Sequence, residues 1–126
     1  MNRVNYQNIS VEQQSILVKT YFGEFTCSEI IESWKSAIKK GLFKTNTARA
    51  ILDFRDAHLH INLKSDIEKL TAYFSSEPTY FRNKKFAIIM TEPQQVTIPI
   101  ILEKNGNIFI SKVFYSLDAG KYWILK

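Results

Sequence analysis

Two short runs of mostly apolar residues constrain the fold more than any other feature of the sequence. One is Arg49–Phe54, in which only Asp53 interrupts the apolar run after the first residue, and the other is Phe86–Met90. Both have the length of a strand rather than of a helix, and neither alternates with polar residues. Strands of this kind are typical of parallel sheets with helices on both faces, so we expect an α/β layer structure.

Two capping boxes predict helices between these strands. Thr26 and Glu29 form the first box, and apolar residues follow it at helical spacing, which predicts a helix over residues 26–40. Ser65 and Glu68 form the second box, which predicts a helix that begins at Ser65 and ends before the next proline. The chain therefore alternates strands and helices.

Further elements precede and follow this central part. Val4–Ile9 and Ser15–Phe22 are rich in β-forming residues and predict an antiparallel pair of strands. Their connection, Ser10–Gln14, contains no glycine, proline or asparagine, so it carries little turn signal. Residues 107–115 predict a strand, and residues 116–125 predict a final helix.

Residues 93–104 permit two interpretations. Pro93 suits the first turn of a helix, but Pro99 would lie in its interior, where proline costs about 3 kcal/mol. The segment is also rich in β-branched residues, and Asn105-Gly106 after it is a strong hairpin signal. The local sequence therefore favours a hairpin strand here.

The overall composition indicates one globular domain over residues 1–126. Seventeen Lys and Arg residues outnumber twelve Asp and Glu residues, but they are scattered, so we expect no nucleic-acid binding. The longest apolar run, Phe86–Met90, is far shorter than the roughly 18 residues of a membrane span. The first residues contain no apolar signal segment, which predicts a cytoplasmic protein.

The order of these elements is similar to that of the STAS-like superfamily, the fold of bacterial anti-sigma-factor antagonists. The resemblance implies a small α/β fold with a mixed, mostly parallel sheet of about four to five strands and about four helices. It also implies that residues 93–104 form a helix. The stretches that carry it are Tyr21–Thr26, Ile51–Ala57, Lys85–Ile89 with Thr91–Pro93, and Val113–Ser116 with Ala119 and Trp123.

The same resemblance implies a non-catalytic module that binds a protein partner in bacterial regulation, without a cofactor. In the antagonists a serine at the start of the helix after the central strand is phosphorylated, and Ser65 is its counterpart here. The Asp-Ser-Ser/Thr-Gly run of the family is replaced by Leu63-Lys64-Ser65-Asp66. The residues also support a simpler role, in which Ser65 is a helix N-cap. Exposed edge strands would permit a homodimer.

A carrier of a small apolar or lipid-like ligand is the alternative function. Tyr73, Phe74, Tyr80 and Phe81 cluster around the end of the second helix. Such a cluster would serve as a surface for a partner or as the mouth of a ligand pocket, or it would simply pack in the core.

An enzyme is the least favoured class. Asp56, His58 and His60 alternate, so in an extended segment they share one face and are a weak candidate for a metal site, although they also fit an exposed loop. Cys27, the only cysteine, lies in the first turn of a helix, where a thiol is activated or simply fills space. The isolated glycines exclude a glycine-rich phosphate loop.

Overall fold

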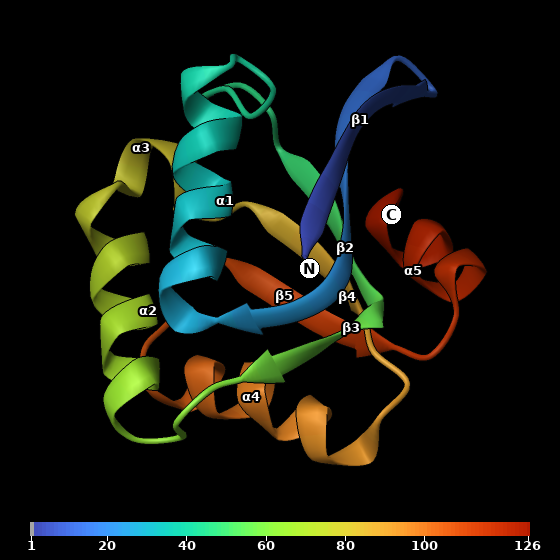
Figure 1. The fold of residues 1–126 in the computed structure, drawn as a ribbon. Helices are drawn as coiled ribbons and strands as arrows, with labels where there is room; N and C mark the ends of the chain where they lie inside the picture. The colour runs from blue at the N-terminus through green and yellow to red at the C-terminus, as the bar shows by residue number, and fades with distance from the viewer. Residues whose placement is uncertain (1) are drawn as a thin grey trace.

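A five-stranded sheet forms the centre of the protein (Figure 1). The computed structural model describes residues 2–126, and its strands lie in the order β1-β2-β3-β4-β5. β1 runs antiparallel to β2, and β2 to β5 run parallel to one another, which confirms the predicted mixed sheet. The strands are β1 (Arg3–Val11), β2 (Gln14–Thr26), β3 (Arg49–His60), β4 (Lys85–Ile89) and β5 (Ile110–Phe114).

The two faces of the sheet are covered unequally. Helices α1, α2 and α4 pack against one face, whereas α5 lies against the other (Figure 1). None of the helices within residues 2–126 is long and apolar enough to cross a membrane. The described helices, one more than expected because α3 is a separate short turn, are α1 (Cys27–Lys39), α2 (Ser65–Ser76), α3 (Pro78–Phe81), α4 (Pro93–Lys104) and α5 (Leu117–Ile124).

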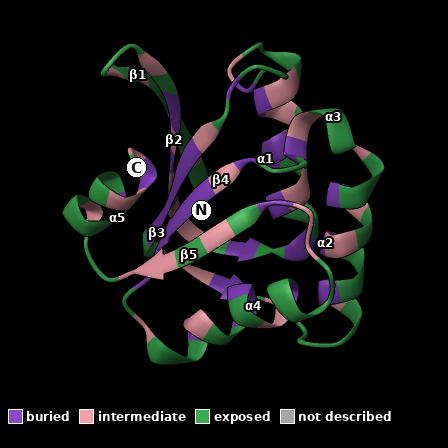
Figure 2. Cartoon of the chain, turned by 180° about the vertical axis from the view of Figure 1, so that it is seen from behind, coloured by how far each residue is buried: buried purple, intermediate pink, exposed green. Residues whose placement is uncertain are grey.

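The two apolar runs form the central strands, as predicted. Every residue of β4 after Lys85 is buried, and Ala50–Phe54 of β3 are buried as well, which Figure 2 shows in purple. β3 continues past its predicted end at Phe54 as far as His60, because β2 pairs with it up to the pair Thr26–His60. β4 follows β3 only to the pair Asp53–Ile89, so the end of β3 is open on that side.

Aromatic side chains fill the larger core around Trp34 of α1. The Trp34 ring stacks on Phe86 of β4 at a centroid distance of 5.2 Å. It also lies 5.1 Å from the ring of Phe43 and 5.3 Å from that of Phe81. Burial of such rings contributes most of the stability of a core of this kind, so α1 and α3 are fixed against the sheet by the same side chain.

Residues 93–104 form helix α4, so the hairpin strand favoured by the local sequence is wrong and the helix implied by the resemblance is found. Pro93 occupies the first helical position, and Pro99 is tolerated inside α4 because Ile98 and Leu102 beside it are buried against the core. Asn105 and Gly106 end the helix: the Asn105 amide binds the carbonyl of Ile101, and Gly106 has a φ of +84°. β5 is correspondingly shorter than the predicted strand over residues 107–115.

The predicted antiparallel pair of β1 and β2 is present, and its turn is tight. Glu12 and Gln13 connect the strands with φ values of 51° and 67°. Both central residues of a type I′ hairpin turn need positive φ, which usually selects Asn and Gly. The turn is therefore imposed by the pairing of the strands rather than by its own residues.

Candidate functional site

Helices α1, α2, α4 and α5 each begin just after one of the parallel strands, at the edge of the sheet where these strands end (Figure 1). α1 follows β2 directly, and its predicted capping box is present. The Glu29 amide donates to Thr26 Oγ1 over 3.3 Å, and the Thr26 amide donates to Glu29 Oε1 over 2.9 Å. This bond to the Thr26 amide is the main reason that the pKa of Glu29 lies below its usual value.

Ser65 begins α2, but it does not cap the helix, so the second predicted capping box is wrong. Asn62 takes that role: its Oδ1 accepts from the amides of Lys64 and Ser65, each over 3.0 Å. Asp66 Oδ2 accepts in turn from the Asn62 amide over 2.8 Å. Ser65 is exposed, and within residues 2–126 its hydroxyl has no hydrogen-bond partner.

An exposed apolar side chain lies directly before this serine. Leu63 is 48% exposed and is one of five exposed large apolar residues in the described chain. Leu63, Lys64, Ser65 and Glu68 are all exposed and form what we call the α2-start surface. It combines an exposed apolar side chain, charges of both signs and, among the described residues, a hydroxyl without a hydrogen-bond partner at the start of a helix.

Cys27 lies beneath the same region, but it is not an activated thiol. Its side chain is 4% exposed, and Sγ lies 3.6 Å from the carbonyl oxygen of Asp66. Burial, followed by the Asp66 carboxylate, raises the pKa of the thiol. The geometry supports the packing role considered for Cys27 and opposes the reactive one.

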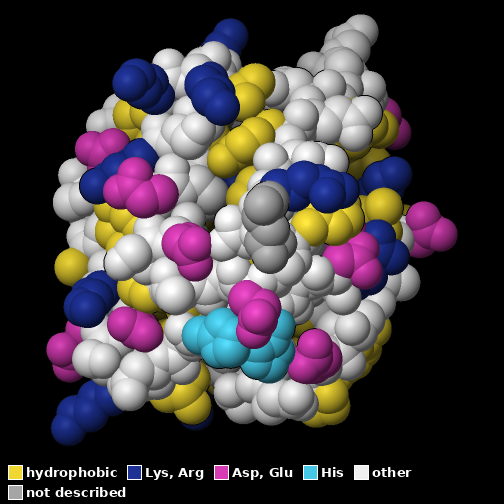
Figure 3. Space-filling view, viewed as in Figure 1, with side chains coloured by type: hydrophobic (Ala, Val, Ile, Leu, Met, Phe, Trp, Pro, Cys, Tyr) yellow, Lys and Arg dark blue, Asp and Glu magenta, His cyan; other side chains and the backbone are white. Residues whose placement is uncertain are grey.

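Asp56, His58 and His60 follow one another on the extended end of β3, and the two histidines pair with different glutamates. His60 Nε2 lies 2.7 Å from Glu24 Oε1, and His58 Nδ1 lies 3.6 Å from Glu92 Oε2. The two imidazole rings meet edge to face at 4.8 Å, forming one patch with acidic neighbours (Figure 3). Within residues 2–126 no group of three or more such side chains is arranged to hold a metal ion.

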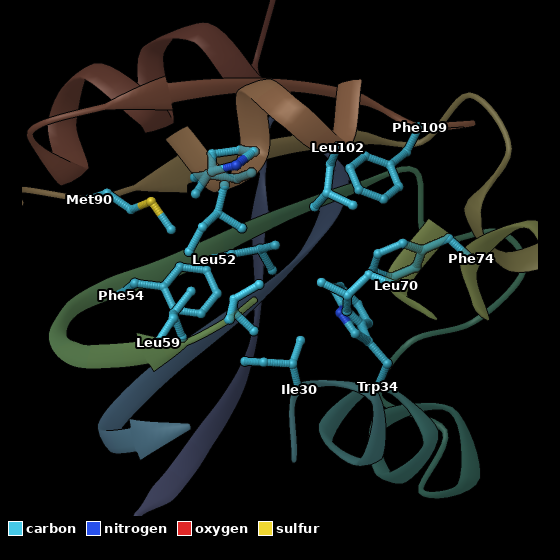
Figure 4. A pocket seen from close by; sticks show the side chains of 14 residues that line it. Ile30, Trp34, Leu52, Phe54, Leu59, Leu70, Phe74, Met90, Leu102 and Phe109 are labelled. Atoms are coloured by element: carbon cyan, nitrogen blue, oxygen red, sulfur yellow. The ribbon is translucent and has the colours of Figure 1, made fainter. Parts of the chain in front are cut away.

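An apolar cavity lies between the sheet and the helices that cover its larger core (Figure 4). Its volume is about 50 Å³, and all fourteen side chains that line it belong to apolar or aromatic residues. They come from both strands and helices and include Ile30, Trp34, Leu52, Phe74, Ile98 and Leu102. The continuous apolar lining expected of a ligand carrier is present, although the space is small.

The four aromatic residues predicted to gather near the end of α2 do not form an exposed patch. Phe74 and Phe81 are buried, with 4% and 0% exposure, and Phe74 lines the apolar cavity. Tyr73 and Tyr80 are half-buried. Burial raises the pKa of Tyr73 to about 12. Core packing, one of the roles considered for this cluster, accounts for the two phenylalanines.

One polar cluster was not anticipated from the sequence. Lys19 of β2 is 0% exposed, and its Nζ donates to Ser33 Oγ of α1 over 2.9 Å. The Tyr21 hydroxyl lies 3.2 Å from the same Ser33 Oγ. Lys19 Nζ also lies 3.5 Å from the centroid of the Trp34 ring. Burial holds the pKa of Lys19 well below its usual value.

The sequence did contain a signal for this cluster. Leu17, Lys19 and Tyr21 alternate along β2 and therefore face the same side of the sheet. Because Leu17 and Tyr21 are large apolar and aromatic residues, this alternation indicates that Lys19 is buried in the core as well.

Comparison with solved structures confirms the fold. The chain matches no protein-family model, and no curated protein matches it. An uncharacterised protein of the DUF3478 family with a SpoIIAA-like fold, from Shewanella loihica PV-4, is 16% identical with a TM-score of 0.68; the match covers 98% of this chain and 95% of that one. An anti-sigma factor antagonist from Mycobacterium paratuberculosis is 13% identical with a TM-score of 0.60, covering 98% and 96% of the two chains. The chain thus has the STAS-like fold that the sequence resemblance implied.

Proposed function

We propose that this chain is a regulatory module that binds a protein partner, rather than an enzyme, and that the partner docks on the α2-start surface. The observation that carries this proposal is the pairing of an exposed Leu63 with the free hydroxyl of Ser65. A protein of the same fold is an anti-sigma factor antagonist, a name that describes action on another protein. A partner that covered the exposed Leu63 side chain would remove apolar surface from water, which favours association.

Phosphorylation of Ser65 would switch this surface. A phosphate adds a charge of about −1.5 to −2 at neutral pH. At the first position of α2 it would meet the positive end of the helix dipole, which stabilises it. Asp66 and Glu68 would oppose it, so the charge presented to the partner would become strongly negative. A partner that accepts Leu63 and a neutral serine would then be released.

Cross-linking inside the source cells tests the docking surface. We expect a tagged chain to capture one protein reproducibly, and Leu63→Asp to lose it. Ile100→Asp is the matched control, because Ile100 is 45% exposed but lies on α4. Equal capture by both variants, or loss with the control alone, would contradict docking at the α2-start surface.

The switch needs a separate measurement. Peptide mapping of the chain from the same cells is expected to find phosphate on Ser65. Binding of the captured partner is expected to fall for Ser65→Glu and to persist for Ser65→Ala, because only the first introduces charge. Full binding by Ser65→Glu would contradict the switch but leave the docking proposal intact.

The apolar cavity favours a second candidate function, the binding of a small apolar ligand. The present volume of about 50 Å³ is below the ~150 Å³ that holds benzene in a dry cavity, so a ligand would have to displace α4. Pro99 lines the cavity and leaves α4 without one backbone hydrogen bond, which weakens the helix at that point.

Calorimetric titration with lauric acid tests this candidate. We expect saturable binding that Ile98→Trp abolishes by filling the cavity, whereas Ile100→Trp, on the exposed side of α4, retains it. Absence of heat with the unmodified chain, or equal binding by the two variants, would speak against the cavity as a lipid site.

A further inference from the structure

We propose that Ser33 is a covalent acyl-acceptor site activated by Lys19, and that it takes its acyl group from an ester or thioester donor. The proposal concerns the groove between β1 and α1 and does not depend on docking at the α2-start surface. It stands on the arrangement of four side chains: Lys19, Ser33, Tyr21 and Trp34.

The first step of the argument is the bonding of the Lys19 amine. Its side chain is 0% exposed, and within residues 2–126 it forms no salt bridge. Ser33 Oγ, at 2.9 Å, is its hydrogen-bonding neighbour. A buried amine without a counter-ion favours the neutral form, which has one lone pair to satisfy. Nζ donates to Ser33 Oγ in the structure, and the Ser33 hydroxyl can donate back to the lone pair once it turns from the Ile30 carbonyl, which gives the arrangement of a nucleophile and its base.

The second step concerns the groups that would stabilise the charges formed during reaction. Trp34 presents its ring face to Lys19 Nζ at 3.5 Å, and cation–π attraction stabilises the ammonium that forms when the amine takes a proton. The Tyr21 hydroxyl, 3.2 Å from Ser33 Oγ, can donate to that oxygen as it loses its proton. In the resting state Ser33 Oγ donates to the Ile30 carbonyl over 2.6 Å, so the hydroxyl must turn towards Lys19 before it attacks.

The third step is access. Ser33 lines an open groove of about 340 Å³ between β1 and α1, although the residue itself is only 6% exposed. Val4, Tyr6 and Phe25 contribute apolar surface to this groove. Its charged lining residues are of both signs: Arg3, Lys40, Glu29 and Glu32. The groove therefore suits a short acyl chain whose carbonyl reaches Ser33.

The chemistry balances without a cofactor. Ser33 Oγ forms a bond to the carbonyl carbon of the donor while its proton passes to Lys19 Nζ. The bond from that carbon to the leaving oxygen or sulfur then breaks, and the leaving group takes the proton from Lys19. The products are an ester on Ser33 and a free alcohol or thiol, and Lys19 is neutral again.

Reaction of the full chain with p-nitrophenyl acetate tests the proposal. We expect intact mass and peptide mapping to find one acetyl group, on Ser33. The rate should fall about 100-fold in Lys19→Met, the lower end of what a general base contributes. Ser36 is an internal control, because it lines the same groove and is more exposed but has no buried amine beside it. An unlabelled Ser33, an unchanged rate in Lys19→Met, or equally fast labelling of Ser36 would overturn the proposal.

A second measurement keeps the test decisive if Lys19→Met fails to fold. The rate of Ser33 acetylation in the unmodified chain should rise with pH through one ionisation below the usual range of lysine. Tyr6 of β1 and Tyr21 of β2 are the titratable groups that face Lys19, and burial raises the pKa of both, so neither ionises in that range. A rate that instead follows hydroxide concentration, without a plateau, would show that Lys19 is not the base.

Discussion

The side-chain amide of Gln95 in α4 bonds both backbone groups of Leu59 in β3. The Leu59 amide donates to Gln95 Oε1 over 2.9 Å, and Gln95 Nε2 donates to the Leu59 carbonyl over 3.4 Å. β4 stops pairing with β3 at Asp53, so this part of β3 has no neighbouring strand on that side. The side-chain amide of Gln95 therefore makes the hydrogen bonds that a neighbouring strand would make to Leu59, and it joins α4 to the sheet.

Replacement of Gln95 by leucine should therefore destabilise the fold. It leaves a buried donor and acceptor at Leu59 without partners, which costs about 1–3 kcal/mol. Urea unfolding measures this difference. Gln94→Leu is the control, because Gln94 is exposed and its side-chain amide donates to the Glu92 carboxylate rather than to the sheet, so its effect should be within about 0.5 kcal/mol. Similar losses in the two variants would show that the Gln95–Leu59 bonds contribute little.

Helix capping gives a second prediction, which separates Asn62 from Ser65. Thr26→Ala and Asn62→Ala should each lower the free energy of unfolding by about 1 kcal/mol, because each removes an oxygen that binds helix amides. Ser65→Ala should change it by less than about 0.5 kcal/mol, since its hydroxyl binds no helix amide within residues 2–126. Chemical denaturation of the three variants would decide this, and a large loss for Ser65→Ala would restore it as the cap.

The contact between Glu24 Oε1 and His60 Nε2 gives a third prediction. The hydrogen bond from His60 is the main reason that the pKa of Glu24 lies below its usual value. His60→Ala should therefore raise the pKa of Glu24, as carbon-detected NMR titration of the carboxyl group would show. Lys64→Ala, an exposed substitution on the α2-start surface, is the control and should leave Glu24 unchanged. An identical Glu24 titration in the two variants would mean that the His60–Glu24 contact does not form in solution.

Local sequence patterns predicted β3, β4 and α1, because the structure of these segments follows from their own residues. The apolar runs of β3 and β4 cannot be exposed to water, and the Thr26 capping box with its apolar stripe forms α1 wherever it lies. The α4 segment was different, because Pro99 and the Asn105-Gly106 pair suggest a hairpin locally. Burial of Ile98 and Leu102 against the core outweighs those local preferences, and the sequence does not show which core is available.

The candidate sites depended still more on tertiary contacts. Ser65 matched a capping box, but the Glu68 amide that such a box would bind donates to the Lys64 carbonyl instead, and Asn62, three residues before Ser65, accepts from the amides of Lys64 and Ser65. Whether Phe74 and Phe81 face water depends on how α2 and α3 pack, which their spacing leaves open. The Lys19–Ser33 contact joins residues on different elements, so alternation along β2 could indicate a buried lysine but not its partner.

Burial of Lys19 also gives the stability of the protein a dependence on pH. Its pKa is lowered in the folded state, whereas the unfolded chain has the usual value of about 10.4. Between the two values the unfolded chain holds a proton that the folded chain lacks. Stability therefore rises with pH in this window, by up to about 1.4 kcal/mol per pH unit, and the gain ends above the unfolded value.

Comparison of Lys19→Met with the unmodified chain isolates this effect. Urea unfolding between about pH 7 and pH 9.5 should show a rising free energy for the unmodified chain and a flatter curve for Lys19→Met. The limit of about pH 9.5 avoids Tyr21, whose raised pKa acts in the opposite direction once free tyrosine ionises near pH 10. Lys35→Met, which removes an exposed lysine from α1, should keep the slope of the unmodified chain. Parallel curves for all three proteins would mean that Lys19 stays protonated in the folded protein.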